Sequence, residues 1–591
     1  MFSHIQAGGN TPATFTGVCG AESGWVPVTA TSPAIFVSQI ETQRIQKTGA
    51  MPPVLSAPAF TIKYAGDTDK MVFDAMKDEM HRTTDSLRVA EAKAPFWVGY
   101  GVTRYRSFDI TGEYGGISLS NQTPWQTNII THVLLGNFKR CSDIPGQPLL
   151  IGSPGTDDMN YAMLRRALWS SSDQAYKSSV MMQAQKESYL NQNPLPSALE
   201  KLPDMQHSAP CTYIVNDSVP YDIDMARLNG YAKELSAIFN DYPYLFNGEV
   251  KISGDEVTSY RATSENVNIK QPHNRVTIKV SAQFEDDQHL RLSDELKLSY
   301  ERPSEIPALD TLKARVRKFA DDCMALRNAE LMTEAYKGPV MFENDAVKEA
   351  FVTSYLSAGD FYAQPSLQEN NKGLGPKTGK KIMDERITIT NETGLTTYQG
   401  QPLYGHYAVD ADGFTPTTPM TLVDKGVFMM MLNRATPAQY APKSTASARF
   451  YNEPGQAVPM VGVGTLHVQA TGTTADEKME KELIKRAKKE KLSFAYVITL
   501  PNNCTCLRLE KIDVKTGQRT LVKSDMMVLP SSEQMKKLVA ISNKEIVRNS
   551  VEPYTYSTIV PASIIVDDME LGKATMKPEK APALIFPLQR K

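Results

Sequence analysis

The sequence predicts a fold of mixed helices and strands with more than one domain, and three observations lead to this prediction. First, 591 residues are too many for a single hydrophobic core, so two or three domains are expected. Second, amphipathic helical segments alternate with strand-like segments before residue 337, whereas the chain beyond it is rich in strands. Third, the tripeptide Lys337-Gly338-Pro339 punctuates the chain between these regions. We therefore expect three regions, at 1–62, 63–336 and 337–591.

The first region, residues 1–62, is rich in Thr, Ala, Pro and Gly. It has neither the basic start nor the apolar stretch of a signal peptide, so none is readable there. We expect a loosely ordered extension. Without a readable targeting signal, the compartment is unknown and a cytoplasmic location is the default expectation.

Residues 63–336 contain helices that are recognised by apolar side chains at helical spacing. In the first, Val72, Met76 and Met80 recur every fourth residue, and residues 67–69 can cap its start. A polar, helix-leaning segment from about 156 to 200 is broken by two prolines. Two further helices carry apolar residues at Met225, Leu228, Leu235 and Phe239, and at Leu312, Val316, Phe319, Cys323 and Leu326.

Strands are expected between these helices, where apolar and polar residues alternate. They cover 95–100, 104–120, 127–135 and 275–280, and the last has the pattern of an antiparallel sheet.

In the third region, strands are expected at 494–500, 507–514 and 520–522, with one charged helix at 476–492. The many Lys and Glu residues of that helix predict a solvated face. Cys504 and Cys506 would share one face of a strand. We expect two buried thiols there rather than a metal site, because no second Cys or His pair is near.

Composition argues against two classes of partner. Lys and Arg total 64 against 66 Asp and Glu, so the formal net charge of −2 gives no basic surface for nucleic acid. The densest apolar stretch, at 427–432, is far shorter than the roughly 20 residues of a membrane-spanning helix. We therefore expect neither a nucleic-acid partner nor a membrane span.

Common catalytic motifs are incomplete. The segment 373–381 resembles a phosphate-binding loop, but Leu374 and Lys381 stand where Gly and Ser or Thr are required. A zinc peptidase helix needs two imidazoles on one face and a carboxylate between them, to activate the metal-bound water. None of the eight histidines lies one helical turn from another, so the sequence contains no such helix.

Four segments in fixed order, spread over the C-terminal half, resemble the TldD/PmbA family of metallopeptidase-related proteins. The matching segments are Gly338–Val347 (a strand running into a helix), Asp384–Ile389 with Gly405–Gly413 (a strand and an acidic turn), Thr421–Phe428 (a strand pair) and Ser557–Leu571 (a terminal strand and acidic tail). The N-terminal half is similar to the family in having a helix followed by strands.

This resemblance implies a two-part α+β fold, with a helix-and-sheet N-terminal domain followed by a metallopeptidase-like domain of curved antiparallel sheet. It implies a homodimer, or a heterodimer with a TldD-like subunit. In catalytic members a His-Glu-x-x-x-His helix and a later Cys hold zinc, whereas this chain has Val352, Thr353 and Ser357 at the three motif positions and no Cys after Cys506. It therefore resembles the PmbA/TldE-like branch, and we expect no cofactor here and zinc only in a catalytic partner.

Three functions follow as hypotheses. The first is a non-catalytic subunit that binds unfolded peptide, alone or with a zinc peptidase. The second is an active metallopeptidase with a non-standard metal site around His406, Asp410 and Asp412, although a polar turn beside a strand also explains these residues. The third is a stand-alone peptide or ligand carrier that binds by strand addition. The candidate cleft comprises Glu349, His406, Asp410 and Asp412, and whether the chain is an enzyme stays open.

Overall fold

The computed structural model describes residues 67–88, 93–155, 159–217, 219–357, 359–451, 459–500, 507–525 and 528–576. The chain divides into two compact units, 1–58 and 59–591, and all of the described residues belong to the second. The expected extension at 1–62, Cys504 and Cys506 lie outside the described residues.

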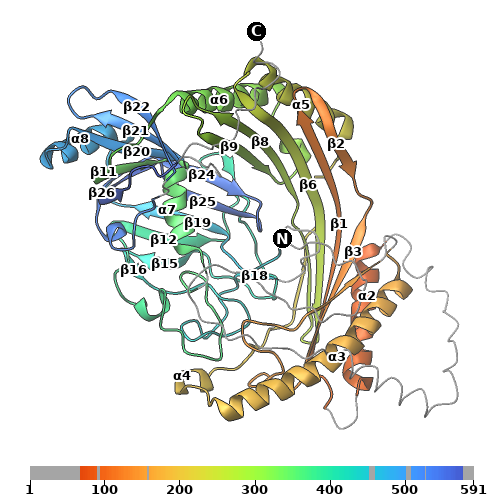
Figure 1. The fold of residues 1–591 in the computed structure, drawn as a ribbon. Coiled ribbons are helices and arrows are strands. Elements are labelled where there is room, and N and C mark those ends of the chain that lie inside the picture. The colour runs from red at the N-terminus through yellow and green to blue at the C-terminus, as the bar shows by residue number, and fades with distance from the viewer. Residues whose placement is uncertain are drawn as a thin grey trace, which may run out of the picture. The chain divides into compact units, whose positions relative to one another are not determined.

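The N-terminal sheet has nine strands, and β1 and β6 run the length of it side by side (Figure 1). Its strands are β1 (Trp97–Glu113), β2 (Gly116–Gln122), β3 (Gln126–Leu134), β4 (Ile151–Pro154), β5 (Cys211–Ile214), β6 (Leu245–Thr263), β7 (Val267–Pro272), β8 (Arg275–Glu285) and β9 (Arg291–Tyr300). Along its other edge, β6 pairs first with β8 and then with β7. Beyond β6 the sheet therefore divides into two parts, β8 with β9 and β7 with β5.

Helices cover one face of this sheet. The even-numbered residues of β1 point to that face, because successive side chains of a strand alternate. Val98, Tyr100 and Val102 pack under α2 (Thr68–Ser86) and α3 (Tyr161–Gln192). Phe108 and Ile110 pack under α5 (Met225–Ser236) and α6 (Leu309–Asn328). The odd-numbered face of β1 is therefore left for other contacts.

These helices confirm the predictions from periodicity. Asp67 caps α2 by accepting a hydrogen bond from the backbone N–H of Lys70. The helix-leaning segment becomes α3 and the short α4 (Ser197–Glu200), separated by the two prolines. No helix in the described residues combines the length and apolar composition that a membrane span requires.

Two further sheets form the C-terminal half. One contains β10 (Glu330–Leu331), β11 (Tyr336–Glu343), β20 (Phe494–Leu500), β21 (Leu507–Asp513), β22 (Arg519–Ser524), β23 (Leu538–Ile541) and β26 (Ser563–Leu571). The other contains β12 (Ile387–Glu392), β15 (Met420–Asp424), β16 (Val427–Phe428), β19 (Thr465–Ala470), β24 (Glu545–Ser550) and β25 (Tyr556–Pro561). The short pairs β13 (Thr397–Tyr398) with β14 (Gln401–Pro402), and β17 (Ala448–Arg449) with β18 (Met460–Val461), lie apart from them.

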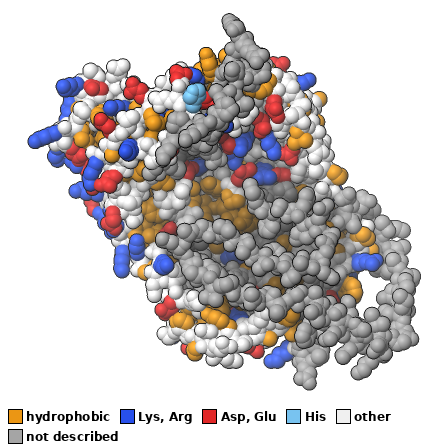
Figure 2. Space-filling view, in the orientation of Figure 1, with side chains coloured by type: hydrophobic (Ala, Val, Ile, Leu, Met, Phe, Trp, Pro, Cys, Tyr) orange, Lys and Arg blue, Asp and Glu red, His pale blue; other side chains and the backbone are white. Residues whose placement is uncertain are grey.

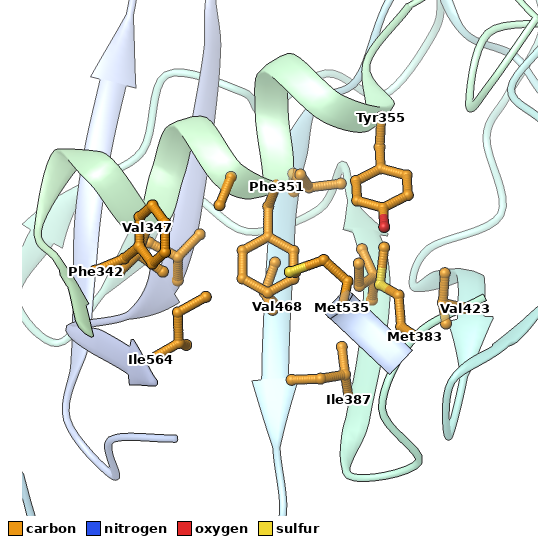
Figure 3. Packing of buried hydrophobic residues seen from close by; sticks show 14 of the residues in the cluster. Phe342, Val347, Phe351, Tyr355, Met383, Ile387, Val423, Val468, Met535 and Ile564 are labelled. Carbon is orange, nitrogen blue, oxygen red and sulfur yellow. The ribbon is translucent and has the colours of Figure 1, made fainter. Parts of the chain in front are cut away.

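The largest core cluster lies between these two sheets and α7 (Asp345–Tyr355). Figure 3 shows Phe351 and Tyr355 pointing from α7 into the cluster, opposite Val468 and Ile387 of the six-stranded sheet. Helix α8 (Met479–Lys489) covers the opposite face of the seven-stranded sheet, which includes Met341. Over this end of the molecule, blue and red side chains are interspersed (Figure 2), in agreement with a mixed surface charge.

The α+β fold class is confirmed, with three corrections of detail. The C-terminal sheets are mixed rather than purely antiparallel, because β10 with β22, β11 with β20 and β19 with β25 are parallel pairs. The expected strand at 104–120 is interrupted by a hairpin turn, where Tyr114 and Gly115 both have positive φ. The sequence Gly152-Ser153-Pro154-Gly155 also predicts a turn, but its first three residues belong to strand β4. The domain boundary at 337–339 stays a prediction, and those residues begin β11.

Candidate functional site

The uncovered face of the N-terminal sheet forms the floor of a cavity of about 300 Å³, which we call the sheet cavity. Gly99, Gly101 and Thr103 of β1 lie along this floor, beside His132 of β3. The Trp97 ring lies over Gly99, where an added Cβ would come within 2.4 Å of the ring. Glycine at 99 therefore accommodates the Trp97 ring, and glycine at 101 adds no side chain to the floor.

The opposite wall of the sheet cavity comes from the C-terminal half of the chain and is mainly apolar. Pro365, Ala435, Phe450, Met460 and Val461 line it. The last two form β18, which pairs with β17. The sheet cavity thus lies at the seam where the two halves of the described chain meet.

A buried carboxylate joins the two walls. Asp412 accepts two hydrogen bonds of 2.9 Å from the Arg434 guanidinium, and its Oδ1 lies 3.1 Å from a terminal nitrogen of Arg261 on β6. Burial alone would raise the pKa of Asp412, but the two guanidinium groups lower it well below its ordinary value. Asp412 is therefore ionised and is shared by both halves of the chain.

The neighbouring carboxylate, Asp410, holds a turn together. It accepts hydrogen bonds from the backbone N–H groups of Asp412, Phe414 and Ala448, at 3.0, 2.8 and 3.0 Å. Burial, followed by the charge of Asp412, raises the pKa of Asp410. Such a carboxylate, with three backbone donors, stabilises the acidic turn itself.

The same turn fits closely against the N-terminal sheet. Gly413 has a φ of 91°, a region that favours glycine. A Cβ at this position would lie 2.6 Å from the Val267 side chain of β7. Val409 and Ala411 pack with Val267 and Ile269 in one buried cluster. The acidic turn is thus a packing element of the seam.

The structure brings together only two of the four residues expected in a cleft. Asp410 and Asp412 share the acidic turn, and Asp412 lines the sheet cavity. His406 is exposed and lines a second cavity of about 270 Å³. Glu349 lies on α7, lines neither cavity, and accepts a hydrogen bond from the Thr353 hydroxyl.

The three positions that the sequence comparison predicts to match the family's zinc motif are engaged in other contacts. Val352 is partly buried against the large core cluster. Thr353 is exposed and donates to Glu349. Ser357 lies beyond the end of α7 and donates a 2.9 Å hydrogen bond to Asp360.

These side chains do not fit zinc, because a valine side chain and two hydroxyls replace the imidazoles and carboxylate that the motif supplies. Within the described ranges, no group of three or more His, Cys, Asp and Glu side chains is placed to hold a metal ion.

Several residues of the sheet cavity were not singled out from the sequence. His132 Nε2 lies 2.6 Å from Asp143 Oδ2, and Asp204 pairs with the buried Lys186 at 2.6 Å. Such pairs depend on tertiary packing and have no sequence pattern. The alternating glycines at 99 and 101 were a usable signal, because a strand that lacks side chains on one face leaves room for a close approach.

Comparisons with known proteins identify the C-terminal half. Residues 335–573 match the model of the PmbA/TldA metallopeptidase C-terminal domain. No curated protein matches the chain.

Solved structures share the fold across most of the chain. TldE from Thermococcus kodakarensis is 12% identical with a TM-score of 0.53, covering 84% of this chain and 100% of its own. A candidate modulator of a DNA gyrase from Thermotoga maritima is 12% identical, with a TM-score of 0.50 and coverage of 86% and 99%. A candidate modulator of DNA gyrase from Bacteroides thetaiotaomicron is 13% identical, with a TM-score of 0.52 and coverage of 86% and 99%. The expected resemblance to the TldD/PmbA family is therefore confirmed: residues 335–573 match its metallopeptidase C-terminal domain, and most of the chain shares the fold of these structures.

Proposed function

We propose that this chain is a non-catalytic member of its family that binds a segment of unfolded peptide in the sheet cavity. The observation that carries the proposal is the glycine-lined floor of β1 facing an apolar wall across about 300 Å³. This volume is at the lower end of ligand-binding pockets, which are mostly apolar with a few polar groups. It suits a few residues of a peptide rather than a folded partner.

The lining supplies both kinds of contact that a peptide needs. Trp97 and Phe450 offer apolar surface for peptide side chains. The His132 ring offers a hydrogen-bonding group for the peptide backbone. Since β1 is paired on both sides, by β3 and β6, peptide would bind through this lining and not by adding a strand to β1.

The non-catalytic part of the proposal rests on α7. The valine and the two hydroxyls at the motif positions have their own contacts, and none replaces an imidazole ligand. We propose that cleavage belongs to a zinc-bearing family member, which this chain joins as a heterodimer, and that a homodimer without cleavage is the alternative assembly.

A cavity-filling variant tests peptide binding. Thr436 lines the sheet cavity and is partly exposed, so Thr436→Trp should weaken binding of a fluorescein-labelled casein peptide by about tenfold or more, measured by anisotropy. Thr396→Trp, at an exposed site outside the cavity linings, is the matched control and should bind as the wild type does. Equal affinity in all three proteins would remove the sheet cavity from consideration.

The non-catalytic part needs a separate measurement. Elemental analysis of chelator-free protein and a casein hydrolysis assay on the same sample should find neither stoichiometric zinc nor cleavage. Zinc at one equivalent per chain, with chelator-sensitive cleavage, would contradict this part of the proposal. If the heterodimer is the working assembly, cleavage should appear when a purified zinc-bearing family member is added to this chain.

A further inference from the structure

A second cavity, of about 270 Å³, lies at the seam and is more polar in its residues than the first. We call it the seam cavity. One side carries the end of β9, with Glu301 and Arg302 directly after it. The other side carries His406 and Arg449 from the C-terminal half. Charged groups of both signs therefore face one enclosed space.

Several charged groups in and beside this cavity already have an ion-pair or hydrogen-bond partner. Arg302 pairs with Asp217 at 2.6 Å. Glu305, next to the cavity, accepts hydrogen bonds from the Tyr404 hydroxyl at 2.8 Å and from the Glu301 backbone N–H at 3.1 Å. These contacts leave two groups of opposite charge to consider, the Glu301 carboxylate and the Arg449 guanidinium.

The Glu301 side chain has hydrogen-bonding capacity left. Its closest described cation is Arg302, with 3.9 Å between the charged atoms, which is longer than a hydrogen bond. Its side chain is 30% exposed. Burial, followed by the neighbouring Glu305 charge, raises the pKa of Glu301 to about 7. The carboxylate is therefore enclosed by protein and still reachable from the cavity.

Arg449, of opposite charge, has N–H donors left for a ligand. In the described part of the chain its guanidinium pairs with no carboxylate within ion-pair distance. It donates a 2.9 Å hydrogen bond to the Thr555 carbonyl and lies 4.0 Å over the Tyr407 ring. Burial lowers its pKa, although an arginine stays charged at neutral pH. One hydrogen bond uses only one of its five N–H donors.

We propose that the seam cavity binds a free α-amino acid, with its ammonium group at Glu301 and its carboxylate at Arg449. A zwitterion matches two opposite unmatched charges across one cavity, whereas a simple anion or cation would match only one. Arginine and carboxylate also suit each other in geometry, because two N–H groups can bind both oxygens. The site involves other charged residues than the sheet cavity does, so it does not depend on peptide binding there.

The walls favour an aromatic side chain on the amino acid. Tyr213, Tyr404 and Phe450 line the seam cavity, and the Phe450 ring stacks on His273 with 5.5 Å between ring centroids. Aromatic pairs in such arrangements stabilise a complex beyond the area that they bury. L-phenylalanine is therefore the probe of choice.

Isothermal titration of L-phenylalanine into the full-length protein tests the site. N-acetyl-L-phenylalanine lacks the ammonium group and L-phenylalanine amide lacks the carboxylate, and each should bind about tenfold or more weakly than L-phenylalanine. If neither blocked compound binds more weakly than L-phenylalanine, or if millimolar L-phenylalanine gives no binding heat, the proposal is wrong.

Variants test which residue binds the ammonium group and which binds the carboxylate. Glu301→Gln keeps the shape of the side chain, and it should weaken L-phenylalanine about tenfold while leaving N-acetyl-L-phenylalanine unchanged. Glu349→Gln is the matched control, because Glu349 is similarly exposed and lines neither cavity. Arg449→Lys keeps a charge but loses the paired donors, and it should weaken L-phenylalanine more than the amide. If Arg449→Lys does not fold, the comparison of Glu301→Gln with the wild type still tests the proposed site. Equal L-phenylalanine affinity in wild type and Glu301→Gln would overturn the assignment.

Discussion

At the scale of single residues, the acidic turn shows how a carboxylate cluster can hold a protein together without doing chemistry. Asp410 and Asp412 are two residues apart, but their surroundings push their pKa values in opposite directions. Backbone N–H groups surround Asp410, and two arginines surround Asp412. Opposed pKa values also occur at catalytic pairs. Here burial and the Asp412 charge raise the pKa of Asp410, whereas Arg434 and Arg261 lower that of Asp412, so packing within the protein accounts for both shifts and favours a structural role.

Removing the Asp412 charge should therefore destabilise the protein. Asp412→Asn would leave Arg261 and Arg434 buried beside each other without their carboxylate. We expect a loss of about 3–5 kcal/mol in the free energy of unfolding, measured by urea denaturation. Asp424→Asn, at an exposed position of β15, should change it by less than about 0.5 kcal/mol. A small effect of Asp412→Asn would mean that the arginines find other partners.

Glu301 gives a pH-dependent prediction at the same scale. Because its pKa is raised to about 7, Glu301 is mostly protonated below that pH and ionised above it. An amino acid keeps its ammonium group over this range, so L-phenylalanine affinity should rise from about pH 6 to about pH 8. The charged or titratable groups facing Glu301 are Glu305, Asp217, Arg302, Arg449 and His406. Burial and then the Arg449 charge lower the pKa of His406 below its ordinary value.

The titration is measured by calorimetry at several pH values, with Glu301→Gln as the comparison. The variant should lose the rise in affinity, since glutamine does not ionise. A rise that persists in Glu301→Gln would assign the pH dependence to another group.

At the scale of elements, α7 contributes to the core of the C-terminal half through one apolar stripe. Val347, Phe351 and Tyr355 recur every fourth residue and form its buried stripe (Figure 3). The motif positions at 352 and 353 follow that stripe around the helix, and Ser357 comes after the helix ends. The apolar stripe of α7 therefore makes the helix a core element.

The contribution of α7 packing to the free energy of unfolding can be measured directly. Phe351 is fully buried, so Phe351→Ala should lower the free energy of unfolding by about 3–5 kcal/mol in urea denaturation. Thr353→Ala, on the exposed side of the same helix, should lower it by less than about 1 kcal/mol. Similar losses in both variants would show that the helix as a whole, and not its apolar stripe, contributes the stability.

Sequence patterns predicted the elements better than they predicted the cavities. The helices at 68–86 and 309–328 follow from apolar residues at helical spacing, which is a local property. The hairpin at Tyr114 and Gly115 was missed, although Gly115-Gly116 is a turn signal and the apolar residues change there from even positions (Ile110, Tyr114) to odd ones (Ile117, Leu119). Both cavities depend on residues that are far apart in sequence, such as Arg261 with Asp412, and no local pattern links such partners.

At the scale of the whole molecule, the seam couples the N-terminal sheet to the C-terminal half. The Arg261–Asp412 ion pair and the buried cluster of Val267, Ile269, Val409 and Ala411 both cross it. Both cavities lie along it as well. Peptide or amino-acid binding at the seam would therefore depend on the two halves holding their positions.

Disrupting the seam should make the two halves unfold separately. Gly413→Val would place a branched side chain at a φ of 91° and against Val267, where even a Cβ would be 2.6 Å from its side chain.

The chain has four tryptophans, at 25, 97, 125 and 169, so tryptophan fluorescence reports on the N-terminal part, whereas far-ultraviolet circular dichroism reports on all elements. The two urea transitions should coincide in the wild type and separate in Gly413→Val. Ala408→Val, at an exposed position outside the cavity linings, should keep them coincident. Separate transitions already in the wild type would show that each half is stable alone, and the seam would then be a binding surface rather than a source of stability.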